Sequence, residues 1–292
     1  MLRRLRQGRW LTIEHGSGAA VAYEHLRTFV SSTVCPDIWN KPTTLSTLPA
    51  SELALLPPAP TLRIQAVAAQ GYTEAELVSR LETAANLADG LLLVSGDVQT
   101  RTSSSLSTVE LLRLAVRLRD AGRLRNAALL VAANPLLQNA DSASRLREKL
   151  DAGAQGVMTQ PHNLLPVRWL RWWDGPAGAV LRGHVPVGMG AAVPRSRKDV
   201  ELWLRLAQVD QADDDAAALL QTWARADAMD DLSRSSLVGA LDAARELGCG
   251  LHLMPMRAAG YAFAARAIDP AAYFDPAGEG RPSEVASNTV HR

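Results

Sequence analysis

The chain has 292 residues, 47% of them hydrophobic, and its 31 basic and 30 acidic residues leave a formal net charge of +1. This even balance, without a dense basic cluster, argues against nucleic-acid binding. No run approaches the roughly 20 apolar residues of a membrane span, and residues 1–10 lack the apolar stretch of a secretory signal, so we expect a cytosolic protein without a membrane partner.

Short apolar runs alternate along the chain with longer segments of helical periodicity, which is typical of parallel β/α units. We predict eight strands, at residues 11–15, 34–39, 62–68, 90–95, 127–132, 156–159, 185–188 and 250–254. Amphipathic helices are predicted at residues 73–87 and 109–121, and a third begins at Asp141 or Ser142. The sequence thus predicts an α/β fold with a single (β/α)8 barrel of the TIM type over residues 1–268. Residues 269–292 are rich in Pro, Gly, Ser and charge and are predicted to form a disordered tail.

The functional side chains of such a barrel project from the carboxyl ends of its strands. Polar residues follow six of the predicted strands, at residues 14–15, 37–41, 95–97, 134, 159–162 and 256–257. The two cysteines, Cys35 and Cys249, lie far apart, and no histidine spacing fits a metal site, so no metal ligand is predicted. We therefore expect a metal-free site among the residues that end the strands.

Residues 149–160, which read KLDAGAQGVMTQ, resemble the K-x-D-A-G-A-x-x-x-x-T-Q stretch of methylenetetrahydrofolate reductases. Four other pieces that resemble this family follow its order along the chain: residues 12–14, 93–97, 185–188 and 251–257. Together they cover about residues 10–268, and several separate motifs in one order make coincidence improbable. The resemblance implies a reductase that passes hydride from NADH or NADPH to FAD, and then to 5,10-methylenetetrahydrofolate.

The resemblance also implies roles for individual residues. Glu14 matches the general acid, and Asp97 matches a catalytic carboxylate that lies beside both the flavin and the pterin. Gln160 matches the amide that binds the pterin, and Arg257 ends the segment that resembles the final strand, so both are predicted to bind the folate substrate. By local sequence alone, Glu14 could be a surface carboxylate and Asp97 a helix cap or turn residue.

A second group of residues is predicted to bind the flavin. Gln65 corresponds to a glutamine of the family's third strand, Asp97 lies at the flavin edge, and Lys149 lies at a phosphate-contacting lysine. Arg145 is four residues before Lys149, hence on the same helical face, from which both could reach a pyrophosphate. An exposed charged helix face is the simpler explanation for Arg145.

Several flavin-contacting residues of that family are replaced in this chain. Asn134 and Leu137 occur where the fifth strand usually carries Tyr and His, and Trp39 is bulky where a small hydroxyl residue is expected. Two other interpretations therefore stay open: a flavin-independent or divergent folate-binding paralogue of one-carbon metabolism, and a non-catalytic barrel that binds folate or a protein partner. A tryptophan face at residues 169–173 fits either a core or a subunit interface, so a homo-oligomer also stays open.

Overall fold

The structure is a computed structural model that describes residues 2–6, 10–15, 33–36, 64–96, 106–255 and 258–268. Within these ranges, no helix is long and apolar enough to cross a membrane. Asp97, Arg257, Trp39 and the tail predicted at residues 269–292 lie outside the described residues.

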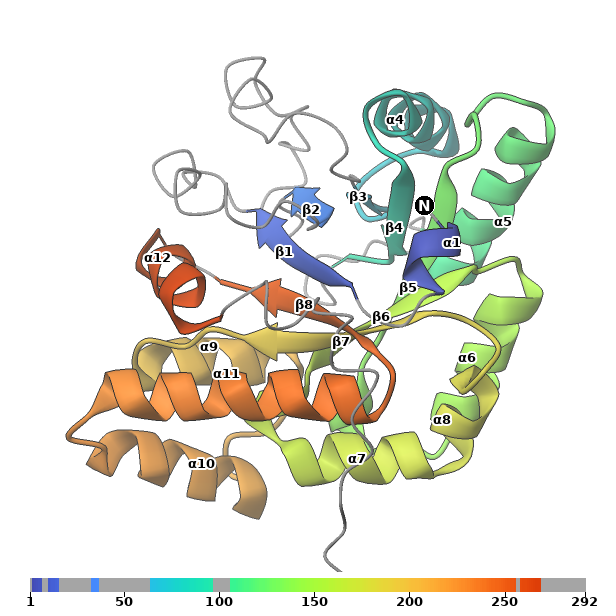
Figure 1. Ribbon diagram of the computed structural model, residues 1–292. Coiled ribbons are helices and arrows are strands. Elements are labelled where there is room, and N and C mark those ends of the chain that lie inside the picture. The colour runs from blue at the N-terminus through green and yellow to red at the C-terminus, as the bar shows by residue number, and fades with distance from the viewer. Residues whose placement is uncertain are drawn as a thin grey trace, which may run out of the picture.

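Eight parallel strands form one sheet, in the order β2-β1-β8-β7-β6-β5-β4-β3. The strands are β1 Leu11–His15, β2 Thr33–Pro36, β3 Ile64–Ala68, β4 Gly90–Val94, β5 Ala128–Ala133, β6 Gly156–Pro161, β7 Val187–Ala192 and β8 Gly250–Met254. β2 and β3, at the two ends of this order, lie next to each other. Figure 1 shows the curled sheet with helices on its outer side. The predicted α/β barrel of the TIM type is confirmed.

Helices follow most of the strands and pack on the outside of the sheet (Figure 1), whereas α1 precedes β1 and packs its Leu5 into the interior cluster with Trp10. They are α1 Leu2–Leu5, α4 Glu74–Leu87, α5 Thr108–Asp120, α6 Ser142–Asp151, α7 Pro166–Asp174, α8 Pro176–Leu181, α9 Arg197–Leu206, α10 Asp214–Arg225, α11 Met229–Glu246 and α12 Ala258–Ala267, with 3₁₀ turns η3 Pro135–Leu137 and η4 His162–Leu164. Thr73 with Glu76, and Ser107 with Glu110, form capping boxes at the starts of α4 and α5. These caps satisfy backbone N–H groups that the first helical turn leaves unpaired.

Trp10 fills the barrel interior near the amino ends of the strands. Its indole packs in a buried cluster with side chains of β3 to β6, namely Ile64, Ala66, Leu92, Leu130 and Met158. The facing positions of β7 and β8 are glycines: a Cβ atom on Gly188 would lie 2.5 Å from the indole, and one on Gly250 only 2.1 Å from it. Since real Cβ contacts are never this short, the large indole requires glycine on both strands.

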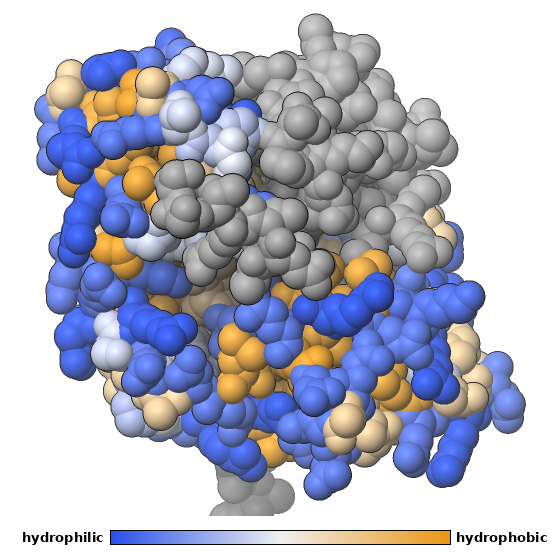
Figure 2. Space-filling view, turned by 180° about the vertical axis from the view of Figure 1, so that it is seen from behind, coloured by the Kyte–Doolittle hydropathy of each residue, from blue (hydrophilic) through white to orange (hydrophobic). Residues whose placement is uncertain are grey.

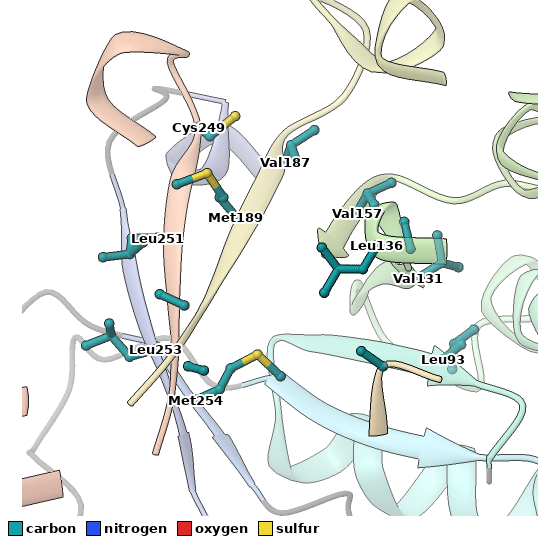
Figure 3. Close-up of a cluster of buried hydrophobic side chains, with 14 of the residues drawn as sticks. Leu93, Val131, Leu136, Val157, Val187, Met189, Cys249, Leu251, Leu253 and Met254 are labelled. Atoms are coloured by element: carbon teal, nitrogen blue, oxygen red, sulfur yellow. The ribbon is translucent and has the colours of Figure 1, made fainter. Parts of the chain in front are cut away.

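The opposite face of β1 and of β3 to β8 packs against the helices. Figure 3 shows part of this layer, in which Val131 and Val157 of neighbouring strands lie near Leu136 of η3. Trp169, Trp172 and Trp173 of α7 are also buried in it, with the rings of Trp169 and Trp173 stacked at 5.4 Å. Of the two interpretations of this tryptophan face, the structure supports the core.

Figure 2 views the molecule from the side opposite to Figure 1 and shows hydrophilic residues interrupted by smaller hydrophobic patches. Among the described residues, four large hydrophobic side chains are exposed: Leu137, Val167, Leu170 and Val238. Val167 and Leu170 are one turn apart on α7, and Leu137 belongs to η3, which packs beside α7, so three of the four lie on the same side of the molecule.

Candidate functional site

On four neighbouring strands, the side chains become partly exposed at the same level, near the carboxyl ends of the strands. On β3, β4, β5 and β6 the preceding residues are all buried, and then one residue is partly exposed. These four residues are Ala68, Val94, Ala132 and Gln160. Because side chains alternate along a strand, all four lie on the same interior face as the cluster around Trp10. We call this set of residues the mouth.

The mouth is lined mainly by small side chains. Ala68 and Ala132 contribute one methyl group each, and both are partly exposed. Barrels of this fold usually fill their interiors with bulky branched residues. The Trp10 indole fills the interior near the amino ends of the strands. The small residues near their carboxyl ends favour a binding site that opens there.

The strand β6 is irregular where Gln160 lies. The pairing of β6 with β7 shifts between Met158 and Pro161, and a Cβ atom on Gly190 would lie 2.3 Å from the Thr159 carbonyl oxygen. Thr159 Oγ1 fixes this region by accepting hydrogen bonds of 3.1 Å from Trp169 Nε1 and from the Gly190 N–H. Strand irregularities of this type often redirect a side chain next to a functional site.

The amide of Gln160 carries a buried oxygen, Oε1, without a hydrogen-bond donor among the described residues. An unpaired buried acceptor costs about 1–3 kcal/mol, so such atoms are rare in folded proteins. An N–H group of a ligand in the mouth would satisfy it.

The other side of the interior is polar at β1 and β8. Thr12 Oγ1 and His252 Nδ1 share a hydrogen bond of 2.6 Å, and both residues are buried. Burial lowers the pKa of His252 to about 3, so its ring is neutral at physiological pH. Glu14 lies two residues after Thr12 on the same face of β1 and is also buried. Thr12 and His252 were not predicted as site residues.

His162 directly follows β6 and His252 belongs to β8, but their side chains lie on opposite sides of the sheet. His252 lies on the interior face of β8, whereas the ring of His162 lies edge-on to Trp169, at 5.3 Å, in the outer layer. Both ring nitrogens of His162 are buried without hydrogen-bond partners among the described residues, and burial lowers its pKa to about 4. His162 therefore belongs to the packing between sheet and helices.

Asn163, another residue that the sequence analysis did not single out, holds the end of β7. Its Oδ1 accepts from the Ala192 N–H at 2.9 Å, and its Nδ2 donates to the Ala192 carbonyl at 2.9 Å and to Ser236 Oγ at 2.8 Å. The side chain thus pairs with both backbone groups of Ala192 as a neighbouring strand would. A polar residue directly after β6 was the only sequence signal for it.

The described residues that were predicted to bind the cofactor are on two elements, β3 and α6. Gln65 alternates with the interior residues Ile64 and Ala66, which puts it on the helix-facing side of β3, where its Nε2 donates to the Ala66 carbonyl at 3.1 Å. Arg145 is exposed on α6. Lys149 Nζ donates to the Ala132 carbonyl at 2.7 Å. The predicted roles of these residues, and those of Asp97 and Arg257, stay predictions.

No family model matches this chain, and no curated protein matches it either. Solved structures share its fold. A protein from Clostridium thermocellum that binds two copies of 5-methyl-5,6,7,8-tetrahydrofolic acid has a TM-score of 0.60 at 16% identity, covering 91% of this chain and 97% of its own. A 2,3-dimethylmalate lyase of the PEP mutase/isocitrate lyase superfamily has a TM-score of 0.54 at 15% identity, covering 99% and 90%. Oxaloacetate acetylhydrolase has a TM-score of 0.51 at 15% identity, covering 98% and 90%. At these identities the likeness shows the fold alone.

These findings correct the assignment to methylenetetrahydrofolate reductases and the oxidoreductase activity that followed from it. The structural neighbours are a folate-binding protein, a lyase and a hydrolase, and no reductase family model matches. FAD and a nicotinamide were expected only because of the resemblance to the reductases. No observation tests whether this protein binds them.

The most specific motif of that resemblance has a structural explanation. Gly153 has a φ of 108° and ends α6, Ala154 is buried, and a Cβ atom on Gly156 would lie 2.6 Å from Leu130 Cδ2. A tight turn from a helix into a barrel strand therefore requires these small residues. Thr159, near the end of the motif, bonds Trp169 in the outer layer. The motif is thus explained by packing in this barrel without any flavin.

Proposed function

We propose that this barrel binds a reduced folate, with the pterin ring in the mouth and Gln160 as its main polar contact. The observation that carries the proposal is the unpaired Oε1 of Gln160 at the mouth. A pterin presents ring N–H and amino donors along one edge, so it can satisfy an acceptor that the described residues leave without a donor. Its flat ring suits a surface made of Ala68, Val94 and Ala132.

The charge of the interior favours a ring over a dicarboxylate ligand. The polar residues that face the interior within the described strands are Thr12, Glu14, Gln160 and His252. None of them supplies positive charge, because the pKa of His252 is lowered to about 3. These four side chains offer no cation to compensate a dianion such as oxaloacetate for its lost hydration, so such a ligand is unfavourable inside the barrel. We therefore favour folate binding over the chemistry of the lyase and hydrolase neighbours.

The ligand of the Clostridium thermocellum protein gives independent support. That protein binds 5-methyltetrahydrofolic acid on a barrel whose fold extends over nearly the whole of this chain. Because 16% identity shows only the fold, we take from it the ligand class and not the contacts. Glu14 lies on the same interior face as Thr12, and we place it as the second acceptor for the pterin edge.

Calorimetric titration with 5-methyltetrahydrofolate tests the proposal. We expect saturable binding, and we expect Gln160→Ala to weaken it about 5- to 100-fold because a pterin donor loses its acceptor. Gln221→Ala, an exposed position on α10, is the matched control and should bind like the natural protein. Absence of folate binding, or saturable binding of oxaloacetate in its place, would overturn the proposal.

A further inference from the structure

Lys149 reaches from the outer layer of the barrel to the strand backbone beside the mouth. It lies in the last turn of α6, and its Nζ donates to the carbonyl of Ala132, one of the four residues that define the mouth. In the part of the chain that the structure describes, no carboxylate lies within ion-pair distance of this ammonium. A half-buried cation bonded only to a neutral carbonyl can still accept an anionic partner.

Arg145 adds a second positive charge on the same face of α6, one turn earlier. Its only ion pair among the described residues is an exposed one with Asp141, at 3.8 Å. Burial and, to a smaller extent, the charge of Arg145 lower the pKa of Lys149 to about 8, whereas Glu148 opposes the shift. Glu148 itself faces Arg113 of α5 at 3.9 Å. The neighbouring β5, β6 and α8 contain no charged residue, so among the described residues the carboxylates that act on the two cations are Asp141 and Glu148.

The same corner of the barrel carries the proposed ring contact. Ala132 on β5 pairs with Met158 on β6, and Gln160 follows Met158 by two residues on the same face. A ligand held by Gln160 therefore has the Lys149 side of the rim beside it. A folate carries one or more glutamate residues at the end opposite its pterin, so its far end is anionic.

We infer that Lys149, with Arg145, receives the glutamate carboxylates of the folate whose pterin lies in the mouth. This inference rests on the proposed function. It assigns the helix face that ends the β5–β6 corner as the tail subsite and predicts that the protein prefers folates with more than one glutamate. A carboxylate beside Lys149 stabilises the charged amine, so tail binding raises the pKa of this residue. At pH 8, where the free amine is about half protonated, binding should therefore take up about 0.4 of a proton.

The test compares three ligands by calorimetry: a tetrahydropterin without a tail, 5-methyltetrahydrofolate, and its triglutamate. The natural protein should bind the triglutamate most tightly, and Lys149→Met should reduce that preference about 5-fold or more while retaining pterin affinity. Titrations at pH 8 in buffers of different ionisation enthalpy measure the proton uptake, which Lys149→Met should abolish. Lys149→Arg should retain the tail preference but take up no proton, because arginine stays charged.

Lys198→Met is the matched control, since Lys198 is exposed on α9, and it should change neither quantity. Thermal melts of each variant confirm folding. Equal affinity for ligands with and without a tail, an unchanged tail preference in folded Lys149→Met, or proton uptake that persists in Lys149→Met would overturn the tail subsite and leave the pterin site standing. Failure of the natural protein to bind any of the three ligands would instead overturn the proposed function, and the tail subsite with it.

Discussion

Thr12 and His252 lie 240 positions apart in the sequence, and their side chains share a hydrogen bond of 2.6 Å inside the barrel. The contact joins the first strand to the last, because β1 pairs with β8 and Thr12 is directly opposite His252 in that pairing. Each side chain satisfies a polar group of the other that is buried from water. The pair thus stabilises the closure of β1 onto β8 next to Glu14.

Thr12→Val should lower the free energy of unfolding by about 1–3 kcal/mol, because valine keeps the shape of threonine and leaves His252 Nδ1 without its partner. Urea unfolding measures this difference. Thr222→Val, at an exposed position on α10, is the control and should change stability by much less. A Thr12→Val protein as stable as the natural one would show that the hydrogen bond contributes nothing net.

Acid should destabilise this protein through its buried histidines. The pKa values of His162 and His252 are lowered to about 4 and about 3, so the unfolded chain binds protons more strongly than the folded one. Their contribution to stability is therefore complete above about pH 6.5 and is lost as the pH falls toward 4. For His162 the loss amounts to about 3 kcal/mol over this range.

His162→Phe isolates that contribution, since Phe can pack against Trp169 and does not titrate. Between pH 6.5 and 4, the unfolding free energy of this variant should fall less steeply than that of the natural protein. His184→Phe is the control, because His184 is exposed and lies outside the core. The same slope in all three proteins would mean that His162 is not a buried neutral histidine.

The fit of Trp10 against Gly250 can be tested from both sides. Gly250→Ala should destabilise the protein by about 1–3 kcal/mol, because its new methyl group would lie 2.1 Å from the indole. Trp10→Ala should cost about 3–5 kcal/mol through the cavity that it leaves. In the double variant the clash is gone, so the two losses should not add. Gly239→Ala on α11, where nothing lies within 4 Å, is the control and should be neutral or stabilising. Additive losses would show that the two residues do not interact.

The fold could be predicted from the sequence because most strands are apolar runs bounded by turns. The strands predicted at residues 90–95 and 250–254 agree with β4 and β8 to within one residue. β7 was misplaced, at residues 185–188 instead of Val187–Ala192, because its Gly and Ala residues have low strand propensity. Tertiary packing determines that strand: Gly188 makes room for Trp10 and Gly190 for the backbone of β6.

The candidate site was predictable only in part. Gln160 could be found because it directly follows an apolar strand, and barrel sites lie at strand ends. The hydrogen bond between Thr12 and His252 could not be predicted, because a contact between the first and last strands leaves no local sequence pattern. The reductase assignment was wrong for the opposite reason: residues 149–160 form a strong local pattern, but the turn after α6 and the packing around Gly156 account for it.

Thr159→Val should weaken both the fold and ligand binding. The valine side chain cannot accept the hydrogen bonds from Trp169 Nε1 and the Gly190 N–H, so two buried donors lose their partner. We expect a loss of about 2–4 kcal/mol in unfolding free energy and weaker folate binding, since Thr159 fixes the backbone that presents Gln160. Thr159→Ser keeps the hydroxyl and should restore most of both. A Thr159→Val protein with natural folate affinity would separate Thr159 from the site.

Ala132→Leu tests whether the mouth is where the ligand binds. Ala132 is partly exposed on the interior face of β5, so a larger side chain can extend into the open end of the barrel without displacing packed atoms. We therefore expect unfolding free energy within about 1 kcal/mol of the natural value but a loss of folate affinity of at least about 10-fold, because the leucine occupies the space of the ring. Ala179→Leu on α8 places the same change on the exterior, and its folate affinity should be unchanged. If folded Ala132→Leu bound folate as the natural protein does, the ring would have to lie elsewhere, and Gln160 would lose its assigned role even if the chain binds folate.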